Sequence, residues 1–444
     1  MTVIKNTIKL SYSNLFSNKE KFSFEKNFPF FTFYLKNTFH FSFKKALALF
    51  FIFHFSFITY SQSLTDYIAL AKQNSSKIQS LKADFEIAKE KTKELATYDN
   101  TSFSFGVFPN TVETRVGSQL INAEISQKLP WFGTLKAQKK LADAEAKLFS
   151  YDTDLYKKEL AYKISKLYYE LYEKQAVRLI LKDNKTLLKT YEDMAIAALA
   201  NNKATMSDVL KIRIQKNELH SKTFQTLNSI EALSKNFNRL LERDINEQLN
   251  IPSVLDVTTI LVGKTEVSNH PLLAKEFQKE QNLSLAEKLI KKKQKPQLKL
   301  AASYTVVAKY ASNPIGNGKD ISYASIGLSL PLFNAKYKSQ LKQNALKKEQ
   351  IKANLNEVNI ALETALETAK LAFENALIQV VAAEKNKEEV QRALNVDLKA
   401  YETGMLNYDR ILKTQLQKIR YELMEVSAVK NAFVAKARID YLIK

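Results

Sequence analysis

The sequence predicts a mainly helical protein that also carries membrane-type β-hairpins, with long antiparallel helical hairpins and an internal two-fold repeat. Three observations predict this fold class. Glycine and proline are scarce, with 8 of each in 444 residues. Strand-like alternation of apolar and polar residues occurs in two regions, each about thirty residues long. Finally, the same sequence landmarks recur at one fixed spacing in the two halves of the chain.

The long helices are predicted from the distribution of glycine and proline. Between Gly133 and Pro252 the chain contains neither residue, and after Pro331 it contains only Gly404. Helix interiors exclude proline, which lacks the N–H donor, and disfavour glycine, which loses the most backbone entropy. Both stretches are therefore expected to be helical, and residues 134–198 alone would form a helix of ~100 Å at 1.5 Å per residue.

The repeat is visible in two pairs of landmarks. Leu129-Pro130-Trp131-Phe132-Gly133 corresponds to Leu330-Pro331-Leu332-Phe333-Asn334, and Ser207-Asp208-Val209-Leu210 corresponds to Tyr408-Asp409-Arg410-Ile411. In both pairs the second copy lies 201 positions after the first. Each half is expected to contain a helix, a β-hairpin, a long helix, a tight turn and a return helix. The expected divisions are a first repeat at 62–250 with its hairpins at 101–129 and 133–250, a linker at 251–269, and a second repeat at 270–444 with its hairpins at 297–331 and 334–444.

The two β-hairpins are predicted from period-two alternation. Phe103, Phe105 and Val107 alternate with small polar residues, and the pattern recurs before Pro331. The expected connections are the polar segments 109–117 and 312–319. Strands of about ten residues span a membrane when tilted, but four strands are too few to close a membrane barrel. If the strands lie in a membrane, several subunits must therefore contribute to one barrel.

The turns between the long helices are candidate contact sites. The breaks are expected at Asn201-Asn202 and Thr403-Gly404, because Asn and Gly tolerate the left-handed conformation that ends helices. Thr205-x-x-Asp208 matches a capping box that would open the return helix. Asp208 and Asp409 have two interpretations: carboxylates at an entrance, or helix-start residues favoured by the helix dipole.

The residues that follow each hairpin form a strand-to-helix junction. Pro130 and Pro331 are expected to end the strands and to set the entry into the long helices. Trp131, Phe132 and Phe333 fit the aromatic belt at a membrane interface, and they also fit packing where the strand turns into the helix.

The N-terminus resembles an export signal. Lys44-Lys45 precedes the apolar run 46–59, and small and polar residues follow it. We expect a signal peptide at 44–61, cleaved after Ser61, behind an extension at 1–43 that reflects a mis-assigned start. The alternative is an N-terminal anchor, although the run is shorter than the ~20 residues that a spanning helix needs.

The composition argues against catalysis, metal binding and nucleic-acid binding. Cysteine is absent, and the sequence shows no common catalytic or nucleotide-binding motif. His220 and His270 lie on separate predicted elements, so no metal site or cofactor is expected. The net charge is +21, but the lysines are interspersed with glutamates along helices, as on solvated faces. We expect neither an enzyme nor a nucleic-acid-binding protein.

These features resemble the TolC-type outer-membrane efflux family over residues 63–443. The resemblance rests on the duplicated strand, Pro-x-Phe and helix unit and on the paired tip turns at 200–210 and 401–412. It implies a homotrimer whose strands close one 12-stranded β-barrel in the outer membrane and whose helices form a periplasmic α-barrel. The tip residues Asn201, Asn202, Asp208, Thr403, Gly404 and Asp409 would then face a periplasmic adaptor and an inner-membrane pump.

The resemblance leaves the cargo open. Residues 108–117 followed by 129–138 resemble the heavy-metal (CusC/CzcC-like) branch, but the N-terminal cysteine that anchors many metal-efflux members as lipoproteins is missing here. The main expectation is a passive export duct for small molecules or metal ions. A type I protein-secretion duct of the same fold and a periplasmic coiled-coil structural protein are the alternatives.

Overall fold

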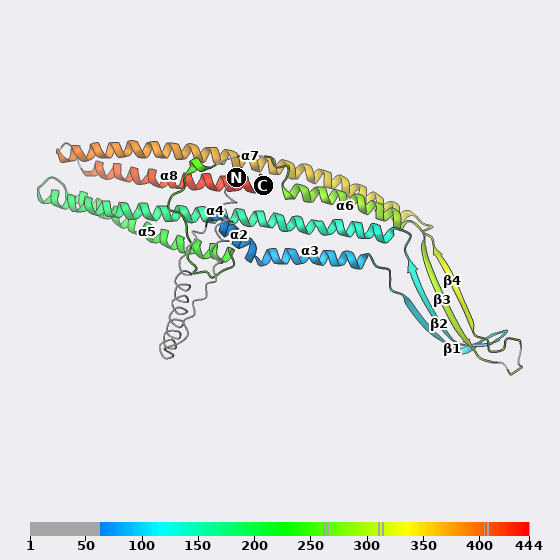
Figure 1. Cartoon of the computed structure of the whole chain (residues 1–444). Helices are drawn as coiled ribbons and strands as arrows, with labels where there is room; N and C mark the ends of the chain where they lie inside the picture. Colours follow the sequence, from blue (N-terminus) through cyan, green and yellow to red (C-terminus); the bar gives the residue numbers. More distant parts are fainter. Residues whose placement is uncertain are drawn as a thin grey trace, which may run out of the picture. The chain divides into compact units, whose positions relative to one another are not determined.

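The computed structural model describes residues 63–443, except for 261–262, 264–265, 310, 313–314, 404 and 406–407. The expected extension and signal peptide lie outside the described residues, as does the predicted turn residue Gly404. Long helices and one β-sheet make up the described chain (Figure 1). In chain order the elements are α2 (Leu64–Asn74), α3 (Ser76–Leu95), β1 (Ser102–Thr114), β2 (Gly117–Leu129), α4 (Thr134–Ala200), α5 (Met206–Leu240), the short 3-10 helix η1 (Val257–Thr259), α6 (Pro271–Lys293), β3 (Gln297–Val307), β4 (Ile321–Ser329), α7 (Ala335–Glu402) and α8 (Tyr408–Ile443).

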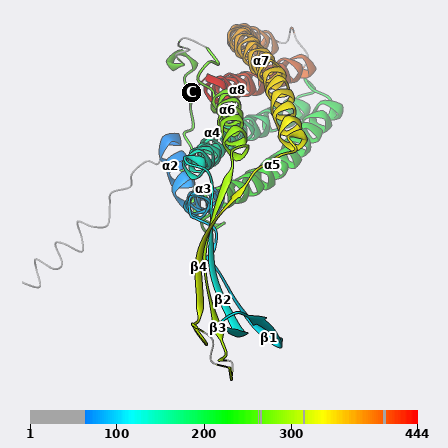
Figure 2. The ribbon, with the colours of Figure 1, turned by 90° about the vertical axis from the view of Figure 1, so that its right-hand side faces the viewer.

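The four strands form one antiparallel sheet in the order β1-β2-β3-β4. The two hairpins are joined through β2 and β3, where Leu129 lies opposite Leu298. The sheet continues from the ends of α3, α4, α6 and α7, and Figure 2 shows it extending away from the helices. Within the described sheet, β1 and β4 are the edge strands, and each has only one neighbour.

The first hairpin turns later than the sequence predicts. The expected connection at 109–117 is wrong, because β1 continues to Thr114 and only two residues separate it from β2. Pro109 is tolerated because β1 is an edge strand whose pairing is irregular between Val107 and Val112. Gly117 is required at the turn, where a Cβ would lie 1.7 Å from the Ala308 carbonyl oxygen.

The long helical hairpins confirm the helical prediction. Helices α4 and α7 contain 67 and 68 residues, and their return helices α5 and α8 contain 35 and 36. The capping box at the start of α5 is also confirmed: Asp208 N donates to Thr205 Oγ1 at 3.3 Å, and Thr205 N donates to the Asp208 carboxylate at 2.9 Å. Helix α5 ends at Leu240, ten residues before the end that the sequence suggests.

The hydrophobic core lies along the helices in three clusters rather than in one centre. The largest cluster is built around Tyr67, Tyr168 and Phe237, and the rings of Tyr67 and Phe237 meet edge to face at 5.1 Å. The Tyr67 hydroxyl accepts a hydrogen bond of 2.9 Å from the backbone N–H of Asn250. This contact ties α2, the first helix that the structure describes, to the segment that follows α5.

Candidate functional site: the sheet and the helix tips

The sheet has one apolar and one polar face. The register places Phe105 beside Ala123, and Ala123 beside Tyr304. Because side chains alternate across a strand, the registers define both faces completely. The mainly apolar face carries Phe103, Phe105, Val107, Ile121, Ala123, Ile125, Leu129, Leu298, Leu300, Ala302, Tyr304, Val306, Ala324, Ile326 and Leu328, with Gln127 and Ser322 as its polar members. The opposite, mainly polar face carries Ser102, Ser104, Asn122, Glu124, Ser126, Lys128, Gln297, Lys299, Ser303, Thr305, Ser325 and Ser329, together with Gly106, Ala301, Ile321, Tyr323 and Gly327.

The apolar face has no cover within the described chain. Phe103, Phe105 and Ile326 are 72%, 63% and 76% exposed, although they lie on regular strands. The polar face holds an ion pair of 3.1 Å between Lys299 and Glu124. An uncovered apolar face backed by a hydrated polar face is the arrangement of a sheet that separates lipid from a water-filled lumen.

The strand-to-helix junction also exposes large apolar side chains. Phe132 and Phe333 are 76% and 89% exposed, and Leu332 is 78% exposed. The Trp131 and Phe132 rings pack edge to face with their centroids 5.8 Å apart. Pro130 directly follows Leu129, the last residue of β2. Pro331 lies two residues after Ser329, the last residue of β4. The exposure of Phe132 and Phe333 favours the interfacial interpretation over packing inside the subunit.

Among the described residues, none of the helices combines enough length with enough apolar character to cross a membrane.

The first helix tip is closed by local hydrogen bonds. Asn201 ends α4, and its side chain donates to the Ala197 carbonyl at 2.8 Å. Asn202 adopts the expected left-handed conformation, with a φ of 54°. Both asparagines are exposed, whereas Asp208 is half-buried and engaged in the capping box. Of the two interpretations of Asp208, the structure supports the helix cap.

The second helix tip is connected to the first through Asp409. Its carboxylate accepts hydrogen bonds from Lys211 of α5 at 2.9 Å and from Lys413 of α8 at 2.7 Å. These two lysines lower the pKa of Asp409 to about 2. Asp409 therefore stays ionised and bridges the two helical hairpins, a role that sequence reasoning missed because Lys211 is 198 residues away.

An aromatic cluster lies directly beneath the two tips. The Tyr408 ring is 2% exposed and meets Tyr191 and Tyr401 edge to face, with centroids 6.0 and 5.8 Å apart. The hydroxyls of Tyr401 and Tyr408 are buried without a hydrogen-bond partner in the described part of the chain. The sequence pattern did not single out these tyrosines, although they hold the two tips together.

The predicted tip residues that the structure describes are thus brought to one end of the helices, the end opposite the sheet (Figure 1). Asn201, Asn202 and Thr403 are exposed, and Met405 beside them is 82% exposed. The junction residues Pro130, Trp131, Phe132, Pro331 and Phe333 gather at the other end, near the sheet. Their contact with partners stays a prediction.

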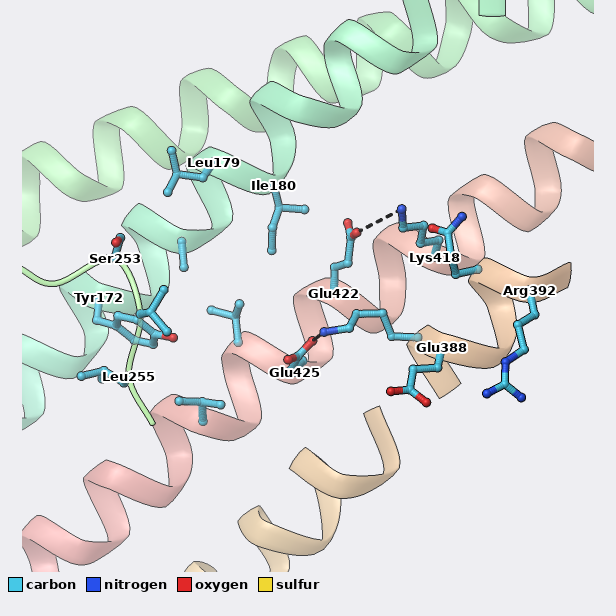
Figure 3. A pocket seen from close by; sticks show the side chains of 16 residues that line it. Tyr172, Leu179, Ile180, Ser253, Leu255, Glu388, Arg392, Lys418, Glu422 and Glu425 are labelled. Carbon is cyan, nitrogen blue, oxygen red and sulfur yellow. Dashed lines mark hydrogen bonds and ion pairs between the residues drawn. The ribbon is translucent and has the colours of Figure 1, made fainter. Parts of the chain in front are cut away.

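A groove of about 880 Å³ lies between α4, α7 and α8 beside the segment 253–255. Figure 3 shows Tyr172 and Leu179 on one side and Glu388 and Arg392 on the other. Ion pairs join Lys387 to Glu425 at 2.5 Å and Lys418 to Glu422 at 3.8 Å. These contacts pair four of the groove's charged side chains, and in the described ranges no group of His, Asp and Glu side chains is placed to bind a metal ion.

His270 has a structural position at the start of α6. Its Nδ1 accepts a hydrogen bond of 3.2 Å from the Leu272 backbone N–H, and its Nε2 is buried without a partner within the described residues. Burial, together with the nearby charges of Lys158 and Arg438, lowers the pKa of His270 from 6.5 to about 4. The neutral imidazole is therefore the form that the fold requires.

This position predicts an acid-dependent loss of stability. A histidine whose pKa is depressed in the folded state makes its full contribution to the free energy of unfolding above its unfolded pKa of 6.5. That stabilisation is lost as the pH drops from about 6.5 to about 4. The melting temperature should therefore fall between pH 7.5 and pH 4.5. His270→Asn also provides a helix cap but does not titrate, so its melting temperature should fall less. An equal fall in both proteins would contradict this role.

The fold is that of the TolC-type outer-membrane channels. The whole-chain similarity to solved structures is high although sequence identity is low. VceC of Vibrio cholerae superposes with a TM-score of 0.69 at 14% identity, covering 85% of this chain and 95% of that one. The channel CusC gives a TM-score of 0.73 at 12% identity, covering 85% and 91%. MtrE of Neisseria gonorrhoeae gives 0.69 at 14%, covering 86% and 88%.

A family model matches most of the second repeat. Residues 262–435 match the family model described as outer membrane efflux protein. The search of curated proteins found no significant match. The resemblance to the TolC-type outer-membrane efflux family that the sequence predicts is confirmed by this match and by the shared fold.

Proposed function

We propose that this protein is the outer-membrane channel of a tripartite efflux system, a passive export duct for small molecules or metal ions. The observation that carries the proposal is the four-stranded sheet with its exposed apolar face, polar opposite face and two single-sided edges. Such a sheet satisfies its backbone in lipid only after closure with further copies of itself. The helices would then extend the duct through the periplasm.

A homotrimer fits the sheet. Three copies of four strands close a 12-stranded barrel, which lies within the range known for outer-membrane barrels. The helices also leave apolar side chains uncovered along α5 and α7. On α5 these are Met206, Leu210, Ile214, Phe224 and Leu227, and on α7 they are Ile360, Leu371, Ile378, Val381 and Val396. Packing of these rows between neighbouring subunits would cover them and continue the barrel below the membrane.

The helix tips are the proposed contact with a periplasmic adaptor and, through it, with an inner-membrane pump. Asn201, Asn202 and Thr403 supply exposed polar groups, and Met405 supplies an adaptable apolar one. Asp208 and Asp409 would hold these exposed residues in position. Asp208 does so through the capping box that starts α5, and Asp409 does so through its ion pair with Lys211.

Two measurements test the proposed function. The purified full chain should form discrete conducting pores in a planar bilayer of neutral lipid. Deletion of the gene should lower the tolerance of the cell to metals or to drugs, each tested separately. A protein that forms no pores would contradict the channel. Unchanged tolerance together with retention of a normally secreted protein would instead support the secretion-duct alternative.

A further inference from the structure

Lysines dominate the helix ends that adjoin the sheet. Helix α4 begins just after β2, α6 ends just before β3, and α7 begins just after β4. In the segments 134–142, 288–295 and 335–348, every charged residue is a lysine. We refer to this set as the junction lysines: Lys136, Lys139, Lys140, Lys288, Lys291, Lys292, Lys293, Lys295, Lys336, Lys338, Lys342, Lys347 and Lys348. In the fourth adjoining helix, α3, Lys91 and Lys93 are paired with glutamates of the same helix.

A groove between α4 and α6 gathers part of this set. Its volume is about 470 Å³, and Ala137 and Leu285 contribute apolar surface to it. The charged lining consists of Lys136, Lys140, Lys288, Lys291, Lys292 and Lys295. A rim of cations around an apolar floor suits an amphiphilic ligand with an anionic head.

Most of this charge is not neutralised by the protein. Lys291 is paired with Glu287 at 2.7 Å, and Lys292 reaches the Phe132 carbonyl oxygen at 3.5 Å. In the part of the chain that the structure describes, Lys136, Lys140, Lys288 and Lys295 have no acidic side chain within ion-pair distance, and all four are exposed. Three acidic residues directly flank these segments, namely Asp143, Glu287 and Glu349. Of these, Glu287 has its pKa lowered to about 2 by hydrogen bonds from Lys291 and Lys348.

The groove lies at the depth of lipid headgroups if the sheet spans the membrane. Phe132, at the aromatic junction, precedes Lys136 by four residues, which corresponds to ~6 Å along a helix. The headgroup layer on each side of the hydrocarbon core is ~5–8 Å thick. Trp131, Phe132 and Phe333 would therefore lie at the edge of the hydrocarbon core. The junction lysines would lie level with the lipid phosphates of the leaflet that faces the helices.

We propose that the junction lysines bind the phosphate headgroups of anionic phospholipids in the periplasmic leaflet of the outer membrane. The proposal rests on the proposed function, because it places the sheet in that membrane. Anionic lipid neutralises cations that no protein carboxylate reaches, and each lysine near a lipid surface contributes roughly fivefold to binding. The bound lipids would fix the depth at which the channel sits.

The test compares lipid binding by two variants of equal charge. Lys136→Gln, Lys140→Gln, Lys288→Gln and Lys295→Gln are combined in the groove variant. The control combines Lys182→Gln, Lys185→Gln, Lys189→Gln and Lys222→Gln, exposed lysines on α4 and α5 with no ion-pair partner among the described residues. Lys182 is ~60 Å along α4 from Lys140, far beyond the screening length of ~10 Å.

Phosphatidylglycerol and phosphatidylcholine with identical acyl chains are titrated into the detergent-solubilised channel, and bound lipids are counted by native mass spectrometry. The wild-type channel and the control should bind phosphatidylglycerol at least fivefold more tightly than phosphatidylcholine, and the groove variant should lose this preference. An equal preference in all three proteins, or an equal loss in the control, would overturn the proposal. If the groove variant does not fold, the α4 pair and the α6 pair are tested separately.

Conductance in neutral bilayers separates this proposal from the proposed function. All three proteins should conduct in phosphatidylcholine. Conduction without any preference for anionic lipid overturns the lipid site and leaves the channel intact. A shifted reversal potential in the groove variant, again without lipid preference, would place these lysines in the lumen and would also overturn the site.

Discussion

Phe105→Lys is expected to prevent membrane insertion, whereas Ser104→Lys in the next position is expected to be tolerated. The two residues are neighbours on β1, but they lie on opposite faces of the sheet. A lysine on the lipid face near the bilayer midplane costs ~2–4 kcal/mol, and each further subunit repeats that cost. A lysine on the polar face stays hydrated.

The measurement is the fraction of each refolded variant that becomes protected from protease in lipid vesicles. Phe105→Lys should insert to a small fraction of the wild-type level. Ser104→Lys should insert normally and change the ion selectivity of the pore. Equal insertion of the two variants would show that the apolar face does not contact lipid. Both variants place a lysine on the same strand. A general effect of added charge on β1 would therefore reduce the insertion of both variants equally.

Tyr408→Ala is expected to destabilise the helix tips strongly, and Tyr408→Phe is expected to leave them as stable or more stable. The ring is buried against Tyr191 and Tyr401, and removing a buried aromatic ring costs ~3–5 kcal/mol. The hydroxyl has no partner in the described structure, and burial raises the pKa of Tyr408. Removing an unsatisfied buried hydroxyl removes its desolvation penalty.

Hydrogen exchange of the amides in α4 and α8 near the tips measures this effect locally. Exchange should accelerate by at least tenfold in Tyr408→Ala and should be unchanged or slower in Tyr408→Phe. If Tyr408→Phe exchanges as fast as Tyr408→Ala, the hydroxyl has a partner in the assembled oligomer. That outcome would contradict the unsatisfied hydroxyl and would place Tyr408 at a subunit interface.

Much of the fold could be predicted because its signals are local. The absence of glycine and proline predicts α4 and α7, and the alternation around Phe105 predicts the two faces of the sheet. The capping box between Thr205 and Asp208 was predictable because both of its hydrogen bonds join residues three apart.

The remaining features depend on contacts between distant residues. The pairing of Leu129 with Leu298 and the bond between Lys211 and Asp409 join residues more than 160 positions apart. A single sequence contains no signal for such pairs. The turn of the first hairpin was misplaced for a different reason: Pro109 is a turn signal unless its strand is known to be an edge.

The most direct test of the central claim is whether β4 of one copy pairs with β1 of the next. The chain has no cysteine, so Ser104→Cys on β1 can be combined in turn with cysteine at Tyr323, Ser325 or Gly327 on β4. Within one subunit these strands are three strand spacings apart, ~14 Å, too far for a disulfide.

After oxidation in the membrane, at least one combination should give a covalent species of three chains on a denaturing gel, which returns to one chain on reduction. The single variant Ser104→Cys should give no such species. Monomers in every combination, or an unlimited ladder of larger products, would contradict a closed trimeric channel.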